Sequence, residues 1–137
     1  MTVSILLVTH EALGSQLLTI ADTICSQQLV PIDQVAVPAN VSPENIGLHA
    51  DQIRERLNEL DKGSGVLVLT DVYGATPDNL ARYFAEQHNA LVVSGVNLPM
   101  LLRVLHYPGQ TLQQLCDTAI CGARTGIQAN AAHRGEA

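Results

Sequence analysis

Aromatic and basic side chains are scarce in this chain of 137 residues. It contains no tryptophan, aromatic residues make up 3% of it, and 7 Lys and Arg stand against 13 Asp and Glu, which gives a net charge of −6. The basic residues are scattered along the chain. Because a nucleic-acid surface needs a clustered basic patch, the composition excludes nucleic acid as an expected partner.

Long apolar runs are also missing. No apolar stretch approaches the ~20 residues that a membrane-spanning helix needs. The first apolar run is not preceded by the basic segment that begins a secretory signal. We therefore expect a cytoplasmic protein that does not insert directly into the membrane.

Cysteine occurs only as Cys25, Cys116 and Cys121, an odd number without CxxC spacing. Cys116 falls on the apolar face of an expected helix, where a cysteine acts as a small hydrophobic residue. We assign no chemistry to the three cysteines and expect no metal site.

The chain is rich in apolar residues: 47% of its residues are hydrophobic and 15% are charged. This composition is typical of folded proteins with a substantial hydrophobic core. Four short apolar runs alternate with helical periods, and most are nearly continuous in Val, Leu and Ile, as in strands buried on both faces. The expected strands are residues 3–8, 32–37, 66–70 and 91–96.

Helix start signals follow each expected strand. The first helix presents an apolar face of Leu13, Leu17, Ile20, Ala21 and Ile24. Ser42-Pro43-Glu44 and Thr76-Pro77-Asp78 each offer a capping residue, a proline and a first-turn acid. Asn97 and Thr111 offer caps for two further helices, the last of which is expected to run to about residue 127.

This alternation predicts an α/β fold with an open, doubly wound, mainly parallel four-stranded sheet and helices on both faces. We expect the strand order 2-1-3-4. Residues 1–128 are assigned to a single domain. The segment 129–137 has no apolar period and is expected to be a loose C-terminal tail.

The candidate site lies where the expected strands end, because ligands of open α/β sheets bind beyond the carboxyl ends of the strands. His10 follows the first strand and Asp71 follows the third. With the order 2-1-3-4 these two strands are neighbours, so the carboxylate can accept one imidazole N–H and leave the other nitrogen free to attack. The remaining histidines fall on helices, a turn and the tail, and we assign them no chemistry.

Small and polar residues beside Asp71 offer a place for a phosphoryl group. Gly74 and Ala75 are small enough for backbone N–H groups to approach an anion at a helix start, and Thr76 adds a hydroxyl besides its expected capping role. Asn97 follows the fourth strand at the same edge of the sheet. We expect these four residues to support the bound phosphoryl group.

Three motifs together resemble a known family: Val8-Thr9-His10, the run from Asp71 to Pro77, and the run Gly95-Val96-Asn97-Leu98-Pro99-Met100. The chain is similar to the mannose-type IIA domain of the phosphoenolpyruvate-dependent sugar phosphotransferase system (mannose, fructose and sorbose family). The resemblance covers residues 1 to about 128. The chain departs from the family pattern at Glu11-Ala12. It also departs at Tyr73-Gly74-Ala75, where the family often has a Trp-Gly-Gly loop.

The resemblance implies a phosphotransferase that works as a phosphohistidine relay. It implies that His10 accepts a phosphoryl group on Nε2 from the phosphocarrier protein HPr, that Asp71 is its partner, and that a histidine of a IIB domain or a regulatory target receives the group. It also implies a homodimer, commonly with an exchanged C-terminal strand, and neither a cofactor nor a metal. Since no IIB domain is fused to the chain, the acceptor is expected to act in trans.

Two other interpretations stay open. One is a receiver-like signalling domain phosphorylated on Asp71, although the first loop lacks an acidic pair and the sole lysine, Lys62, precedes the third strand. The other is a regulatory binding module without transfer activity. The sequence leaves open whether a relay would serve sugar transport or regulation, and which sugar or acceptor protein is involved.

Overall fold

The computed structural model describes residues 2–25 and 30–130 of the chain. These residues form a four-stranded parallel sheet from β1 (Ser4–His10), β2 (Ile32–Val37), β3 (Val66–Thr70) and β4 (Ala90–Ser94). The strand order is β2-β1-β3-β4, which confirms the expected doubly wound order. All four expected strands are present, with ends shifted by up to two residues for β1 and β4.

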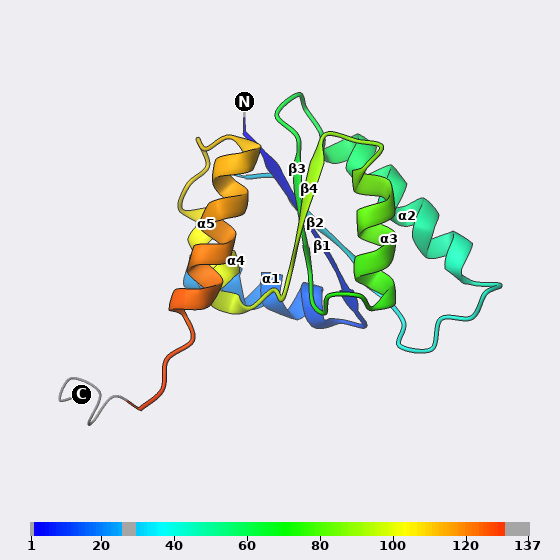
Figure 1. Cartoon of the computed structure of the whole chain (residues 1–137), viewed down its shortest axis with the longest axis horizontal. Coiled ribbons are helices and arrows are strands. Elements are labelled where there is room, and N and C mark those ends of the chain that lie inside the picture. Colours follow the sequence, from blue (N-terminus) through cyan, green and yellow to red (C-terminus); the bar gives the residue numbers. More distant parts are fainter. Residues whose placement is uncertain (1, 26–29, 131–137) are drawn as a thin grey trace.

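The sheet lies between two layers of helices (Figure 1). Helices α1 (Leu13–Ile24), α4 (Leu98–Leu105) and α5 (Leu112–Thr125) cover one face. Helices α2 (Ile46–Leu60) and α3 (Thr76–Ala85) cover the other. Alternate residues of the central strands therefore enter two separate cores.

Strands β1 and β3 are buried on both faces, which explains their nearly continuous apolar sequence. Leu7 and Leu69 pack into the core on the α1, α4 and α5 side, whereas Leu6 and Val68 pack into the core under α2 and α3. Leu7 lies opposite Leu69 in the parallel register. This pairing carries the chain ends of β1 and β3 to the same edge of the sheet.

The expected apolar face of α1 is partly wrong. Leu13, Ile20 and Ile24 are exposed, while Gly14 and Ala21 are buried. Gly14 permits the close contact, because a Cβ there would lie 3.0 Å from the Thr9 hydroxyl oxygen. The helix is therefore rotated so that its small residues and the partly buried Leu17 and Leu18 face the sheet.

The start of α2 also differs from the expectation. Asn45, not Ser42, is the residue before the helix. The carbonyl of Ser42 accepts the backbone N–H groups of Asn45 and Ile46, which forms a turn just before α2. The Ser42-Pro43-Glu44 signal thus marks this turn and not the first residue of the helix.

The cap of α5 agrees with its sequence signal. The Thr111 hydroxyl accepts the backbone N–H of Gln114 at 3.3 Å, and the Gln114 side chain accepts the Thr111 N–H at 3.0 Å, which forms a capping box. The helix ends at Thr125, slightly earlier than expected.

Two sequence expectations concern regions that the structure covers only partly. Residues 131–137 of the expected tail lie outside the described residues, and the domain boundary at residue 128 stays a prediction. Within residues 2–25 and 30–130, no helix is long and apolar enough to cross a membrane.

Replacing Thr111 with Ala removes one half of the capping box, so we expect the free energy of unfolding to fall by about 1 kcal/mol. Urea unfolding of the two proteins measures this difference. Thr111→Ser keeps the capping oxygen and should retain most of the stability. Equal stability of Thr111→Ala and the parent chain would show that the cap contributes nothing.

Candidate active site

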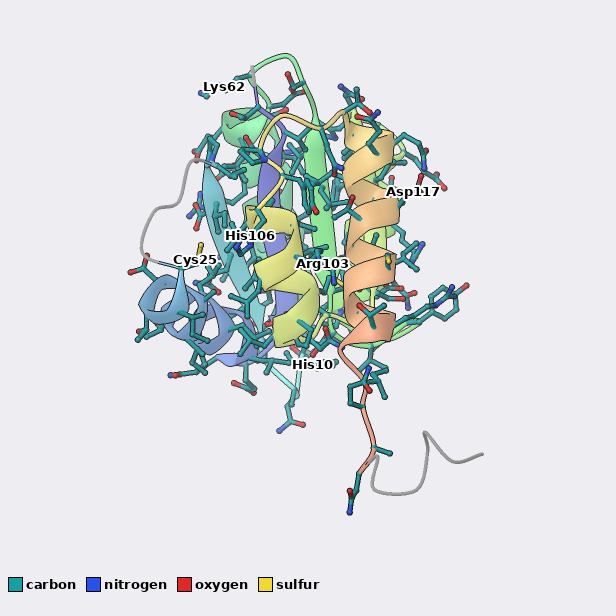
Figure 2. The ribbon with its side chains drawn as sticks, turned by 90° about the vertical axis from the view of Figure 1, so that its left-hand side faces the viewer. His10, Cys25, Lys62, Arg103, His106 and Asp117 are labelled. Atoms are coloured by element: carbon teal, nitrogen blue, oxygen red, sulfur yellow. The ribbon has the colours of Figure 1, made fainter. Side chains whose placement is uncertain are left out.

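His10 ends β1 at the carboxyl edge of the sheet. Figure 2 shows it at the end of the molecule opposite Lys62. Its side chain is 34% exposed, so the ring is partly held by the protein and partly open to a second molecule. The strand thus delivers an accessible imidazole to the edge where ligands of open α/β sheets bind.

Asp71, directly after β3, holds His10 through two hydrogen bonds. Nδ1 of the His10 ring lies 2.8 Å from Oδ2 of Asp71, and the backbone N–H of His10 donates to the same oxygen at 3.0 Å. The Asp71 side chain is 8% exposed. The structure therefore brings together the two residues that the sequence placed on neighbouring strands.

The contact with Asp71 fixes the tautomer of a neutral His10. An ionised carboxylate only accepts hydrogen bonds, so the ring proton lies on Nδ1. The lone pair is then on Nε2, the nitrogen turned away from Asp71. A ring in this state has its nucleophilic nitrogen available.

Asp71 is held in its ionised form. Burial raises the pKa of the Asp71 carboxyl, but the hydrogen bonds from the His10 backbone N–H and from the His10 ring outweigh it. The pKa consequently lies below its ordinary value. A carboxylate that stays charged can stabilise positive charge on the imidazole.

The loop after Asp71 is shaped by Gly74 and ends at the start of α3. Gly74 has a φ of 86°, in the left-handed region that glycine adopts without strain. The structure makes Ala75 the residue before the helix and Thr76 its first residue, so the capping role expected for Thr76 is wrong. Among residues 2–25 and 30–130, no hydrogen bond engages the Thr76 hydroxyl.

The N–H groups of this loop are not all available to an anion. The Gly74 N–H donates to Oδ2 of Asp78 at 3.0 Å, and the Ala75 N–H donates to the Val72 carbonyl at 3.3 Å. Thr76 follows these two residues as the first residue of α3, at the N-terminus of the helix.

Both polar atoms of the Asn97 side chain have hydrogen-bond partners within the protein. Its side-chain oxygen accepts the Met100 N–H at 2.8 Å and caps α4, and its Nδ2 lies 3.4 Å from the Ala123 carbonyl oxygen. The structure thus confirms the expected cap. The supporting role for a phosphoryl group stays a prediction.

Glu11 has an unusual backbone and a defined side-chain contact. Its φ of 50° is left-handed, a conformation that costs a non-glycine residue about 1–3 kcal/mol. Its Oε1 accepts the backbone N–H of Ala39 at 2.8 Å, which links the turn after β1 to the loop after β2. The carboxylate beside His10 is therefore anchored rather than free.

Asp78 and Arg82 were not assigned to the site from the sequence. Asp78 is fully buried, and its carboxylate accepts hydrogen bonds from the hydroxyl of Thr70, the N–H of Gly74 and Nε of Arg82. The available signal was an acid and a base four residues apart on a helix. Such pairs usually lie on a solvated face, so the burial of Asp78 was not expected.

A groove of ≈ 420 Å³ lies beside the site and not on it. Tyr73 and Arg82 line it together with residues of β4 and α5. His10 does not line it. The described residues contain no group of three or more His, Cys, Asp or Glu side chains arranged to hold a metal ion.

Comparison with known proteins adds a family to this geometry. A family model described as "PTS system fructose IIA component" (EIIA-man) matches residues 4–119. The chain belongs to this family. It is therefore a IIA component of the mannose/fructose type, and IIA components are phosphotransfer proteins of the sugar phosphotransferase system.

Curated relatives support the assignment. The chain is 30% identical over 132 residues to the mannose-specific EIIAB component of Escherichia coli K12, a match that covers 94% of this chain and 40% of the relative. It is 38% identical over 72 residues to the fructose-specific EIIA component of Bacillus subtilis 168, across 52% of this chain and 49% of that one. The chain thus spans well under half of the mannose-specific relative.

A solved structure shows the same fold. The mannose/sorbose-specific IIA subunit from Enterococcus faecalis superposes with a TM-score of 0.80 at 21% identity, covering 94% of this chain and 95% of that one. At this identity the likeness concerns the fold alone.

The buried Asp78 carboxylate makes the free energy of unfolding depend on pH. Burial raises its pKa, but the hydrogen bonds from Arg82, Gly74 and Thr70 and the charge of Arg82 lower it, and the net pKa lies below the ordinary value. A lowered pKa in the folded state contributes stability that is present above the unfolded value of about 3.9 and is lost as the pH falls through the folded value.

We therefore expect the difference in unfolding free energy between the parent chain and Asp78→Asn to stay level between about pH 7 and pH 5 and to shrink below about pH 4. Urea unfolding at a series of pH values measures it. Asp51→Asn removes an exposed ion pair with Arg54 and serves as the control, with a difference near zero throughout. A difference for Asp78→Asn that does not change with pH would contradict the account.

Proposed function

We propose that this chain accepts a phosphoryl group from HPr on Nε2 of His10 and passes it to a histidine of a IIB domain or to a regulatory target. The observation that carries the proposal is the hydrogen bond of Nδ1 to Asp71, because it leaves Nε2 as the free nucleophile on a ring that is about one-third exposed. The family of the chain supplies the reaction class.

The transfer is a displacement at phosphorus between two histidines. The Nε2 lone pair of His10 forms a bond to phosphorus while the bond from phosphorus to the donor nitrogen of HPr breaks, and that electron pair returns to the donor ring. The His10 ring becomes positively charged with the proton kept on Nδ1, where the Asp71 carboxylate stabilises it. The reverse displacement by an acceptor histidine restores the neutral ring.

Alignment and charge balance are the tasks left to the protein, since phosphoryl transfer needs little covalent participation from the surroundings. We assign the Thr76 hydroxyl and amide to a phosphoryl oxygen at the N-terminus of α3. Gly74 and Ala75 support this position mainly through the shape of the loop, because their N–H groups bond elsewhere. Asn97 is retained as a supporting residue through its place at the start of α4. The scheme uses neither a metal nor a cofactor.

The partners belong to the proposal as well. HPr is the donor, a IIB histidine or a regulatory target is the acceptor, and residues 1–128 form the domain that carries His10. We further propose a homodimer, which the resemblance implies. Transport and regulation are both compatible with a relay of this kind.

The proposal is tested by incubating the chain with phosphoenolpyruvate, enzyme I and HPr and measuring its intact mass. We expect one added phosphoryl group that is labile in acid and stable in alkali. His10→Ala should abolish labelling, and His106→Ala, which changes an exposed histidine directly after α4, should not.

Asp71→Asn should slow labelling by on the order of 10²-fold while the chain stays folded, because the amide no longer stabilises the charged ring. Undiminished labelling of His10→Ala would disprove the relay. A label that is lost in alkali would instead favour a receiver-like acyl phosphate on Asp71. Absence of any label with active donors would favour a binding module.

Removing the charge of Glu11 should favour the phosphorylated state. Glu11→Gln keeps an oxygen for the Ala39 N–H but no longer places a carboxylate next to a phosphoryl dianion. We expect the equilibrium constant for phosphoryl transfer from HPr to rise about 2- to 5-fold, as roughly 0.5–1 kcal/mol would give. Quantifying phosphorylated and free protein by intact mass at several HPr ratios measures it.

The matched control for this prediction is Glu59→Gln, which removes an equal charge from the exposed side of α2, where Glu59 pairs with Arg56. It should leave the equilibrium unchanged. An equal shift in both variants would indicate an effect of net charge alone.

A further inference from the structure

One fully buried carboxylate, that of Asp78 on α3, connects the two parts of the site. Its Oδ1 accepts the hydroxyl of Thr70 at 2.6 Å, and its Oδ2 accepts the N–H of Gly74 at 3.0 Å. Thr70 is the last residue of β3, immediately before Asp71. Gly74 lies in the turn from Val72 to Ala75, just before Thr76. Asp78 therefore bonds to the chain on both sides of the segment that carries Asp71 and its loop.

Arg82 completes the hydrogen bonding of Asp78 and extends the network to the surface. Its Nε donates to Oδ2 of Asp78 at 2.8 Å, and its guanidinium carbon lies 4.9 Å from the centre of the Tyr73 ring. Tyr73 is 74% exposed, although it belongs to the same loop. A guanidinium at this distance from an aromatic ring attracts it. The network thus runs from the buried end of β3 to an exposed ring next to the site.

The Asp78 carboxylate ties the loop, through Gly74, to the end of β3, through Thr70. Between Asp71 and Thr76 the loop is also held by the two bonds from His10 to Asp71 and by the Val72 N–H, which donates to the Asp71 carboxylate at 3.1 Å. The Ala75 N–H donates to the Val72 carbonyl at 3.3 Å, and Nδ2 of Asn79 donates to the Gly74 carbonyl at 2.9 Å. Asp78 is a single buried carboxylate that accepts hydrogen bonds both from the end of β3 and from the loop. Hydrogen bonds to a charged group are shorter and stronger than neutral ones.

We propose that Asp78, paired with Arg82, is a positioning residue for the phosphoryl transfer, which sets the distance between the Asp71 and His10 pair and the phosphoryl-binding loop. This inference rests on the proposed relay function. Asp78 does not contact the reacting atoms. Arg82 additionally holds Tyr73 at the rim of the site, where a docking protein meets it.

The separate tasks of these residues predict different kinetic defects. Loss of the Asp78 bonds misplaces the loop around a correctly docked donor, so it lowers kcat. Loss of Tyr73 removes an exposed contact with the docking protein, so it raises KM. A displacement of about 1 Å at a reacting centre can lower a rate by roughly 10²-fold.

The experiment measures phosphoryl transfer from phosphorylated HPr by rapid mixing, with kcat and KM determined separately. We expect Asp78→Asn to lower kcat about 10- to 100-fold with little change in KM. Tyr73→Leu should raise KM with kcat nearly unchanged. Arg82→Met should show both defects, and Arg82→Lys should restore part of kcat because an ammonium group retains the charge beside Asp78.

Folding is controlled in two ways. Thr70→Val removes a single hydrogen bond to Asp78 and keeps the size of the side chain, so it should lower kcat in the same direction even if Asp78→Asn does not fold. Arg54→Met, which breaks an exposed ion pair on α2, should leave kcat and KM unchanged. Thermal melting of every variant separates a general loss of stability from a defect in transfer.

The amide signal of Gly74 in a two-dimensional NMR spectrum provides a readout that does not depend on transfer. An N–H bound to a carboxylate gives a downfield proton signal, and Asp78→Asn should move it upfield. Wild-type kcat in folded Asp78→Asn and Thr70→Val would overturn the positioning role while the relay stands. An unmoved Gly74 signal would overturn the geometry itself. A parent chain that takes no label from phosphorylated HPr would overturn the relay, and this inference with it.

Discussion

The hydrogen bond between Nδ1 of His10 and Oδ2 of Asp71 joins the ends of the two central strands, and the rest of the site is arranged around it. It requires β1 and β3 to be neighbours in parallel register, since only then do the residues after them meet at one edge. It also sets the tautomer of a neutral ring, because a carboxylate that accepts the Nδ1 proton leaves the lone pair on Nε2. Helices on both sides of the sheet keep that edge in place (Figure 1).

The residues adjacent to this pair are each tied to a different element. The Thr9 hydroxyl accepts the N–H of Gly14 at the start of α1, Glu11 accepts the N–H of Ala39 after β2, and Thr70 donates to Asp78 on α3. Movement of any one of these segments would shift one side of the His10 and Asp71 pair. The geometry of this pair therefore depends on the packing of several helices, although the pair itself consists of only two side chains.

The sequence predicted the features that depend on local pattern. The strands follow from apolar runs, and the His10 and Asp71 pair follows from the strand order. Two helix starts were misplaced because Ser42-Pro43 and Thr76-Pro77 signal a chain reversal near a helix without specifying which residue caps it. The face of α1 was misassigned because two sets of residues fit a helical period, and the contact of Gly14 with Thr9 decides between them.

Asp78 shows where prediction from the sequence ends. Its role depends on the simultaneous approach of Thr70, Gly74 and Arg82, which only the assembled fold brings about. In the sequence, an acid four residues before a base looks the same whether the pair is buried, as here, or exposed to solvent. The position of Glu11 is a similar case, since its left-handed backbone and its bond to Ala39 become visible only when β1 and β2 are paired.

The measurement that tests the central claim most directly is the nitrogen-15 NMR spectrum of the histidine-labelled chain after phosphorylation by phosphoenolpyruvate, enzyme I and HPr. The account predicts a phosphoryl group on Nε2 of His10, with Nδ1 still protonated and bonded to Asp71. A phosphoryl group on Nδ1, or on any residue other than His10, would contradict it.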